Sequence, residues 1–286
     1  MINISASSFA RAHVCTILNA GTRMASNTHT TAGTYNKIPR SKLHVSKPVW
    51  WLESRFHFSF ADYFNLDNTN FGALRVLNDD LVQPRAGFGR HPHRDAEIFT
   101  YVVQGQLSHQ DSMGNKEALP RGCVQYLSAG TGITHSEMNE GSEVCRFLQI
   151  WLTPDRHGHT PQYGSTTFDQ SDRHNKLLHI LGGTKKVPDW EAAKGHVSDI
   201  RLHQDANVYI SESDPGLEYN ISLSPQRQAY MVCIEGSMDI GGNTLTERDA
   251  IEVVAGDDEK MPLSMKAGEK GMHFLLIEMK KDSVVN

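Results

Sequence analysis

Two histidines separated by a single residue are the first sign of chemistry in this sequence. His91 and His93 lie in the segment GFGRHPHRDAE, which spans residues 87–97. On an extended strand, residues i and i+2 point to the same face, so both imidazoles can converge on one point. Pro92 lies between them and would point to the opposite face, which is tolerated at an edge strand or at the start of a strand. The pair therefore predicts two nitrogen ligands of one metal ion.

A second pair follows a glycine-rich turn. The segment AGTGITHSE, residues 129–137, places His135 and Glu137 two residues apart, which repeats the same geometry. Three imidazoles and one carboxylate suit iron, copper, nickel, manganese or zinc, and open coordination positions favour Fe(II) or a similar redox metal. We predict one divalent transition metal, Fe(II) first, with Cu(II), Ni(II) or Mn(II) as alternatives. Its predicted ligands are His91, His93, His135 and Glu137.

Two nearby features are further candidates. His157 and His159 form another pair of the same spacing, but Gly158 and a following proline interrupt it, so we predict a loop there. Glu97 follows His93 by four residues and shares its face if the strand continues. It could be a fifth ligand, a solvated charge or a hydrogen-bond partner of a ligating imidazole, and we expect the last.

Short strands must position these residues. Runs of β-branched, aromatic and aliphatic residues, separated by glycine, proline and asparagine turns, recur along the chain. The first series covers residues 73–77, 97–103, 124–127 and 146–152. The second covers residues 207–211, 217–223, 228–234, 250–254 and 273–278. This rhythm predicts an all-β sandwich or barrel rather than a parallel α/β sheet, and one short helix is expected at Pro188–Lys194.

The two series predict two domains of ordinary size. A polar stretch between residues 154 and 197 interrupts the regular succession of predicted strands and separates the two domains. We predict a disordered or targeting extension at residues 1–45, a metal-binding domain at 46–165 and a second β-domain at 166–286. The second domain has no histidine between His203 and His273, so it cannot offer an H-x-H set of its own.

Composition excludes several classes of protein. The chain has 286 residues and a formal net charge of -5, and it carries no dense basic run, so a nucleic-acid interface is not expected. No stretch approaches the roughly 20 consecutive apolar residues of a membrane helix. Four cysteines without paired spacing are typical of a reducing compartment.

The N-terminal segment differs from the rest in charge. Residues 1–52 contain no Asp or Glu, but they contain Arg11, Arg23, Lys37, Arg40, Lys42 and Lys47. An acid-free, Ser/Thr-rich leader of this kind is either a disordered extension or an organelle transit peptide. We expect a cytoplasmic protein, with import into the mitochondrion or another organelle, or a nuclear location, as alternatives.

Longer blocks of sequence resemble the pirin family. These blocks are HFSFADYF, LRVLNDD, GFGRHPHRDAEIFTYVVQGQLSHQDSMGN and LSAGTGITHSEMN, at residues 57–64, 74–80, 87–115 and 127–139. The resemblance is closest to bacterial pirin-like proteins with quercetin 2,3-dioxygenase activity. It implies a bicupin, with two jelly-roll β-barrel domains, a metal bound in the first and a degenerate, metal-free second domain. The family's metal set falls on the same four residues, His91, His93, His135 and Glu137.

The resemblance also implies a reaction. A flavonol and O2 would be the substrates, and ring opening would release carbon monoxide and a depside. Glu137 is the expected acceptor of the flavonol hydroxyl proton. The pocket should be apolar and aromatic, with Tyr126, Phe99 and Met138 as candidate walls, although for all three a place in the barrel core is the stronger expectation. The alternative function is a non-enzymatic, iron-dependent, redox-sensing protein that binds a transcription factor, as animal pirins do.

Overall fold

The first domain is a sandwich of two antiparallel sheets. The structure is a computed structural model that describes residues 33–183, 188, 190–193 and 198–281. A seven-stranded sheet has the order β12-β9-β6-β11-β4-β3-β2, and a four-stranded sheet has the order β5-β10-β7-β8. The strands are β2 His44–Val49, β3 Leu52–Phe56, β4 Leu74–Val82, β5 Ala86–His93, β6 Glu97–Gln104, β7 Gln106–Asp111, β8 Lys116–Pro120, β9 Cys123–Ser128, β10 Ile133–Asn139, β11 Cys145–Leu152 and β12 Gln162–Thr167.

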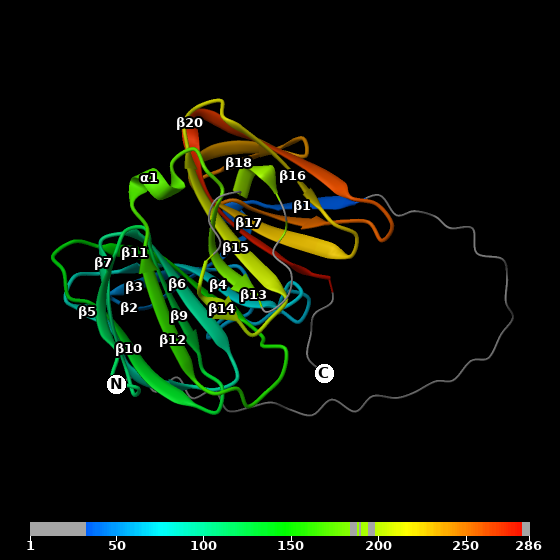
Figure 1. Cartoon of the computed structure of the whole chain (residues 1–286). Coiled ribbons are helices and arrows are strands. Elements are labelled where there is room, and N and C mark those ends of the chain that lie inside the picture. The colour runs from blue at the N-terminus through cyan, green and yellow to red at the C-terminus, as the bar shows by residue number, and fades with distance from the viewer. Residues whose placement is uncertain (1–32, 184–187, 189, 194–197, 282–286) are drawn as a thin grey trace, which may run out of the picture.

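The second domain is one large sheet that curls on itself. Its order is β1-β19-β17-β20-β15-β13-β14, with β16 paired to β20 and β18 paired to β17. The strands are β1 Thr34–Ile38, β13 Leu178–Gly183, β14 Arg201–Leu202, β15 Ala206–Ser213, β16 Glu218–Leu223, β17 Arg227–Ile240, β18 Asn243–Thr246, β19 Ala250–Val254 and β20 Met261–Lys280. The prediction of an all-β chain with two jelly-roll domains is confirmed, and Figure 1 shows the cyan-to-green first domain against the yellow-to-red second domain.

The largest apolar cluster lies between the two domains. Phe99 and Tyr101 of β6 pack with Tyr230 of β17 and Ile277 of β20, and all four side chains are fully buried. Burying a large apolar side chain stabilises a fold by about 1.5–3 kcal/mol. Strand β6 is therefore covered on both faces, by the second domain on one side and by the interior of the first domain on the other. Its near-continuous apolar sequence follows from this double burial.

The predicted N-terminal extension is too long. Strand β1, at Thr34–Ile38, pairs antiparallel with β19 along its whole length, and Figure 1 shows it, in blue, among the strands of the second domain. The backbone N–H of Arg40 donates to Asp249 at 2.8 Å, and Lys37 lies 3.3 Å from the same carboxylate. Thr34, Tyr35 and Ile38 favour a strand that completes the edge of the sheet. The positive charges of residues 1–52 led to the prediction of an extension instead. Residues 1–32 lie outside the described part of the chain.

Two strands are longer than the sequence predicts because their glycines bend them without ending them. Gly236 in β17 has a φ of 77°, and Gly271 in β20 has a φ of 75°. A Cβ on Gly236 would lie 2.3 Å from the carbonyl oxygen of Gly271, so the two backbones cross too closely for any other residue. The pairing of β17 with β20 shifts register at Gly236, and both strands continue into the other face of the curled sheet.

Helices are short in this protein. The structure has an α-helical turn at Gln170–Arg173 (α1), which the sequence pattern did not predict, and 3-10 turns at Arg40–Lys42 and Glu191–Ala193. The last of these lies inside the helix expected at residues 188–194, part of which falls outside the described residues. No helix in the described part of the chain is long and apolar enough to cross a membrane.

Candidate metal centre

Neighbouring strands of the four-stranded sheet bring three histidines together. On β10, His135 lies directly opposite His91 of β5, and Ile133 lies opposite His93. The imidazole centroids are 4.5 Å apart for His91 and His135, and 4.8 Å apart for each of the other two pairs. One nitrogen from each ring lies within 4.8 Å of the others. The structure thus brings together the three histidines that the sequence singled out.

The protonation state of these rings suits a divalent metal. Both ring nitrogens of His135 and Nε2 of His93 are buried and have no hydrogen-bond partner among the residues that the structure describes. Burial, reinforced by the neighbouring imidazoles, lowers the pKa of His93 and of His135 to about 3, so both rings are neutral at ordinary pH. Nδ1 of His91 lies 2.7 Å from the carbonyl oxygen of Gly89, which fixes the proton there and leaves Nε2 free to act as a ligand.

Glu137 lies beside the three histidines but is held by other residues. Its Oε2 is 4.0 Å from Nε2 of His135, and a register shift in the β5–β10 pairing separates the two residues. The Thr100 hydroxyl donates to Oε1 at 3.2 Å, and the Gln149 amide donates to Oε2 at 3.1 Å. Burial is the largest influence on this carboxyl and raises its pKa, while His91 and the two hydrogen bonds oppose the shift.

A row of polar side chains crosses the facing sheet next to Glu137. Gln149 of β11 lies opposite Thr100 of β6 on one side and Asn78 of β4 on the other, and Thr100 lies opposite Gln125 of β9. All four are buried. Neither amide atom of Gln125 has a hydrogen-bond partner within the described part of the chain. This row was not predicted, because single polar residues inside apolar strands carry no spacing signal.

A fourth histidine adjoins the site. His109 of β7 lies opposite Glu137 of β10, and its ring centroid is 5.4 Å from that of His135. Its Nε2 is 3.4 Å from Asp111, while its buried Nδ1 has no partner. His109 was not among the predicted site residues, although His109 and Asp111 share the i, i+2 spacing that marked the other pairs.

Two aromatic side chains border the histidines. Trp151 of β11 contacts His93 edge to face, with centroids 4.9 Å apart, and Tyr163 of β12 stacks on His109 at 4.9 Å. Both rings also pack against a small apolar cluster whose buried members are Ile98, Leu127, Ala129 and Ile133. This cluster and the two rings form an apolar and aromatic wall beside the histidines, which we call the aromatic wall.

The stronger expectation for the three wall candidates, a place in the core, is confirmed for Phe99 and Tyr126. Phe99 and Tyr126 belong to the apolar cluster between the domains, so they point away from the histidines, and their strand neighbours Ile98 and Leu127 face the site. Met138 alternates with Glu137 on β10 and is half-buried on the opposite face. In a strand, a shift of one residue exchanges the two faces, and a strand buried on both faces shows no alternation to fix the choice.

Glu97 does not contact the candidate metal ligands either. Strand β5 ends at His93, Asp95 adopts a left-handed conformation with a φ of 49°, and β6 begins at Glu97 in the other sheet. The buried Glu97 carboxylate accepts hydrogen bonds from Tyr126 and Ser128. The expected partnership with an imidazole ligand is therefore wrong, because the strand does not continue past His93.

The remaining H-x-H pair lies in a loop, as predicted. Residues 153–161 connect β11 to β12, and His157 is exposed within them. His159 is buried and lies 2.8 Å from Asp155. Neither residue belongs to the group of three histidines.

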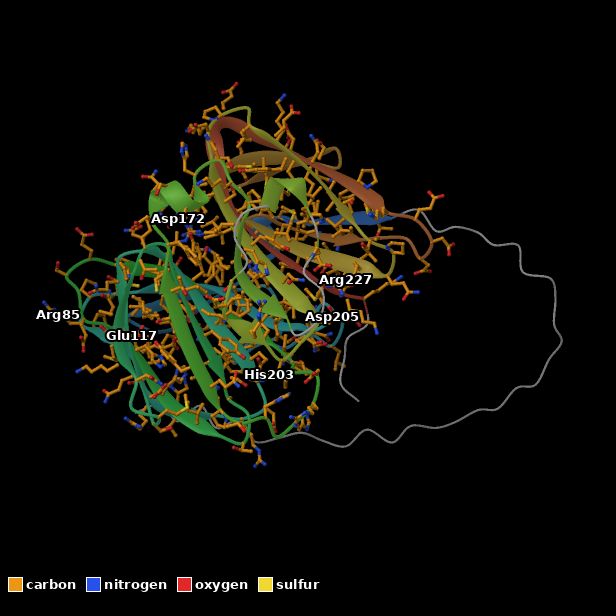
Figure 2. All side chains as sticks on the ribbon, in the orientation of Figure 1. Arg85, Glu117, Asp172, His203, Asp205 and Arg227 are labelled. Atoms are coloured by element: carbon orange, nitrogen blue, oxygen red, sulfur yellow. The ribbon has the colours of Figure 1, made fainter. Side chains whose placement is uncertain are left out.

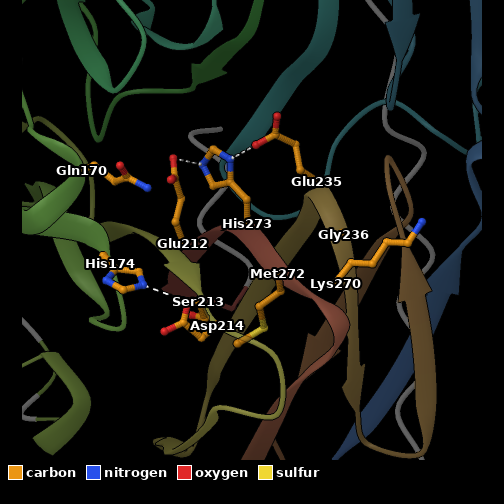
Figure 3. Close-up of a pocket in the computed structure, with 10 residues that line it drawn as sticks. All are labelled: Gln170, His174, Glu212, Ser213, Asp214, Glu235, Gly236, Lys270, Met272 and His273. Atoms are coloured by element: carbon orange, nitrogen blue, oxygen red, sulfur yellow. Dashed lines mark hydrogen bonds and ion pairs between the residues drawn. The ribbon is translucent and has the colours of Figure 1, made fainter.

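A cavity of about 220 Å³ lies elsewhere and is lined by residues C-terminal to the first domain (Figure 3). Its lining includes His273, which lies 2.8 Å from Glu235 and 3.8 Å from Glu212. Arg121 of the first domain pairs with both of these carboxylates, and the Tyr101 hydroxyl lies 3.0 Å from His273. Because these charges compensate one another across the junction, they stabilise the contact between the domains.

Comparison with known proteins agrees with this architecture. Residues 39–152 match the sequence model of the family described as Pirin, and residues 191–279 match the model described as quercetinase C-terminal cupin domain. A Zymomonas mobilis protein, whose name assigns quercetin 2,3-dioxygenase activity provisionally, is 42% identical over 219 residues, which cover 77% of this chain and 88% of the relative. The quercetin 2,3-dioxygenase of Escherichia coli K12 is 37% identical over 204 residues, covering 71% and 83%.

A solved structure shows the same likeness. The crystal structure of the bacterial pirin YhhW from Escherichia coli, in complex with nickel(II), superimposes with a TM-score of 0.75. The match has 31% sequence identity and covers 87% of this chain and all of the other.

Proposed function

Because the chain belongs to the pirin family, we propose that it is a quercetin 2,3-dioxygenase-type oxygenase that cleaves a flavonol with O2. The observation that carries this proposal is the convergence of three imidazoles next to a buried carboxylate and the aromatic wall. We assign the metal ligands to His91, His93, His135 and Glu137. Imidazole nitrogens such as Nε2 of His93 and Nε2 of His135, which are buried and have no hydrogen-bond partner among the described residues, fit a divalent transition metal. Fe(II) is the proposed ion, and Cu(II), Ni(II) and Mn(II) are alternatives.

A metal bound there supplies Lewis acidity and redox chemistry with dioxygen. The residues of the chain supply the remaining functions. Glu137 takes the proton of the flavonol 3-hydroxyl on a carboxylate oxygen. Burial raises the pKa of this carboxyl, which makes its ionised form a stronger base than an exposed glutamate.

Thr100 and Gln149 hold that carboxylate in place. Both are neutral hydrogen-bond donors, so they can bind the ionised group without supplying a competing positive charge. Their strands, β6 and β11, belong to the sheet that faces the histidines, which gives Glu137 a support independent of the sheet that carries it. A rigidly positioned base loses little entropy when the substrate binds.

The aromatic wall orients the substrate and excludes water. Trp151 and Tyr163 offer flat surfaces that match the fused rings of a flavonol, and Ile98 and Leu127 offer apolar contact. In the reaction, the 3-hydroxyl proton passes to Glu137 and returns to the depside product. Both atoms of O2 enter that depside, and the carbon that carried the 3-hydroxyl leaves with its own oxygen as carbon monoxide.

Anaerobic metal analysis followed by an aerobic assay of quercetin loss tests this proposal. We expect about one metal ion per chain and turnover that disappears in Glu137→Ala. Glu137→Gln keeps the size of the side chain but cannot take the proton, so it should also be inactive. One metal ion per chain without any turnover would contradict the oxygenase and favour a redox-sensing binding protein.

A further inference from the structure

Two stacked histidines join the domains beside the candidate metal centre. The ring centroids of His159 and His203 are 3.8 Å apart, and the ring planes are inclined by 11°. His159 lies in the β11–β12 loop of the first domain, whereas His203 lies between β14 and β15 of the second domain and is labelled in Figure 2. Each imidazole also faces a carboxylate, at 2.8 Å for His159 and Asp155 and at 3.4 Å for His203 and Glu97.

The Glu97 carboxylate, at the start of β6, forms hydrogen bonds that connect the second domain to the first. It accepts hydrogen bonds from the Ser128 hydroxyl at 2.7 Å and from the backbone N–H of His203 at 2.9 Å, as well as from the Tyr126 hydroxyl. Nδ1 of His203 also lies 3.2 Å from the Ser128 hydroxyl. Glu97 is 1% exposed, so losing these hydrogen bonds would leave a buried polar group unsatisfied, which is costly. The contact between Glu97 and His203 therefore stabilises the packing of the two domains.

The loop that carries His159 is attached to the turn leading into His135. The backbone N–H of Thr131 donates to the carbonyl oxygen of His159 at 2.9 Å. A Cβ on Gly130, whose φ is 44°, would lie 2.0 Å from the same oxygen, so only glycine permits this approach. On the other side of the turn, the backbone N–H of Gly158 donates to the side chain of Asp95 at 2.7 Å.

The second domain holds the same loop from the opposite side. The backbone N–H of Asp155 donates to the carbonyl oxygen of His203 at 2.6 Å. The Gln204 amide donates to the carbonyl oxygen of Thr153 at 2.7 Å. The loop joins the ends of β11 and β12, the strands that carry Trp151 and Tyr163 of the aromatic wall.

We propose that Glu97, His159 and His203 are positioning residues through which the second domain fixes the rim of the metal centre. They act through the Gly130–Thr131 turn on His135 and through the loop on the aromatic wall. The second domain thereby contributes to the site without providing a ligand. The effect on flavonol binding rests on the proposed function, whereas the effects on the loop and on the metal do not.

The test compares the nickel(II)-loaded full chain with His203→Ala, His203→Phe and Arg121→Gln variants. His203→Ala removes the stacked ring and its polar contact, and His203→Phe keeps a ring in case the alanine variant does not fold. Arg121→Gln breaks another contact between the domains, the ion pairs with Glu212 and Glu235, and is the matched control. The measurements are amide hydrogen exchange, the rate of nickel(II) release to a chelator, and anaerobic binding of 3-hydroxyflavone.

We expect His203→Ala to raise exchange in residues 129–132 and 153–161, and to speed nickel(II) release about tenfold, the lower end of what a lost supporting contact costs a metal site. His203→Phe should show the same changes to a smaller degree, and Arg121→Gln should show neither. Changes in both His203 variants that do not exceed those of Arg121→Gln would overturn the proposal. A wild-type chain that binds no 3-hydroxyflavone would contradict the proposed function, while exchange and nickel release would still decide the role of His203.

Discussion

The side-chain amide nitrogen of Gln149 lies 3.1 Å from Oε2 of Glu137, although the two residues belong to different sheets of the first domain. This hydrogen bond crosses the interior of the sandwich and ends 4.0 Å from the imidazole of His135. The position of the candidate ligand Glu137 therefore depends on the packing of both sheets. A substitution on β11 should change metal affinity even though β11 provides no ligand.

Gln149→Leu should weaken metal binding about 10- to 100-fold, which is the usual cost of losing a partner that orients a ligand. The substitution keeps the volume of the side chain but removes a donor from the buried carboxylate, so the pKa of Glu137 should rise further. Competition with a chelator of known affinity measures the change.

Gln125→Leu is the matched control, because Gln125 belongs to the same polar row but has no hydrogen bond to Glu137. Metal affinity should be retained in this variant. Its stability should not fall, since the substitution removes two buried polar atoms that have no protein partner. Equal losses of affinity in the two leucine variants would contradict a specific role for Gln149.

His91→Ala and His135→Ala should each abolish stoichiometric metal binding and leave the fold intact. Each substitution removes one of three nitrogen donors that converge within 4.8 Å, and the strands that carry them keep their backbone pairing. Metal analysis of the purified variants, together with circular dichroism, measures both effects. His157→Ala changes an exposed loop histidine and should bind metal like the wild type. Full metal retention in both cluster variants would refute the site.

Asp80→Asn should change the pH dependence of stability. Burial raises the pKa of Asp80 to about 7, against a partial compensation by its hydrogen bond from Ser54. Between pH 4 and pH 7 the folded protein therefore holds a proton that the unfolded chain releases, so this carboxyl lowers stability as the pH rises through that range. A tenfold difference in the acid dissociation constant between the two states corresponds to about 1.4 kcal/mol.

Urea unfolding of both proteins at pH 5 and pH 8 measures this effect. At pH 5 only the first part of this loss has occurred, so the asparagine variant should be only slightly more stable than the wild type. At pH 8 the variant should be more stable by a few kcal/mol, since asparagine has no charge to bury. An identical free-energy difference at the two pH values would show that Asp80 does not titrate in this range.

The sequence predicts where the strands lie better than it predicts which residues of a strand point toward the candidate site. Each predicted strand corresponds to an observed one, because turn residues bound the apolar runs. The histidine pairs also converge as expected, since alternation on a strand fixes their face. The weaker expectation for Phe99, a place in the pocket wall, was wrong, and Ile98 faces the site instead, because β6 is buried on both sides and shows no alternation. Glu97 was misplaced because a single left-handed residue, Asp95, ends the strand.

Contacts between distant segments are the part that spacing cannot reveal. Glu97 meets His203 across 106 residues, and β1 meets β19 across more than 200. Such pairings depend on how the two domains pack, and neither partner has an unusual local sequence. The same reason explains why Gln149 and Thr100, which hold Glu137, were not selected from the sequence.

Deletion of residues 1–42 should destabilise the protein, whereas deletion of residues 1–32 should not. The longer deletion removes β1 and with it five residue pairs to β19, as well as the contacts of Lys37 and Arg40 with Asp249. It also exposes the edge of β19, whose unpaired backbone N–H and C=O groups favour association between copies of the chain. We expect the longer deletion to lower Tm by several degrees, since about 1 kcal/mol corresponds to a change of 2–4 °C in a chain of this size. Calorimetry and size-exclusion chromatography of the two deletions measure the effect, and equal Tm values would show that β1 contributes nothing to the second domain.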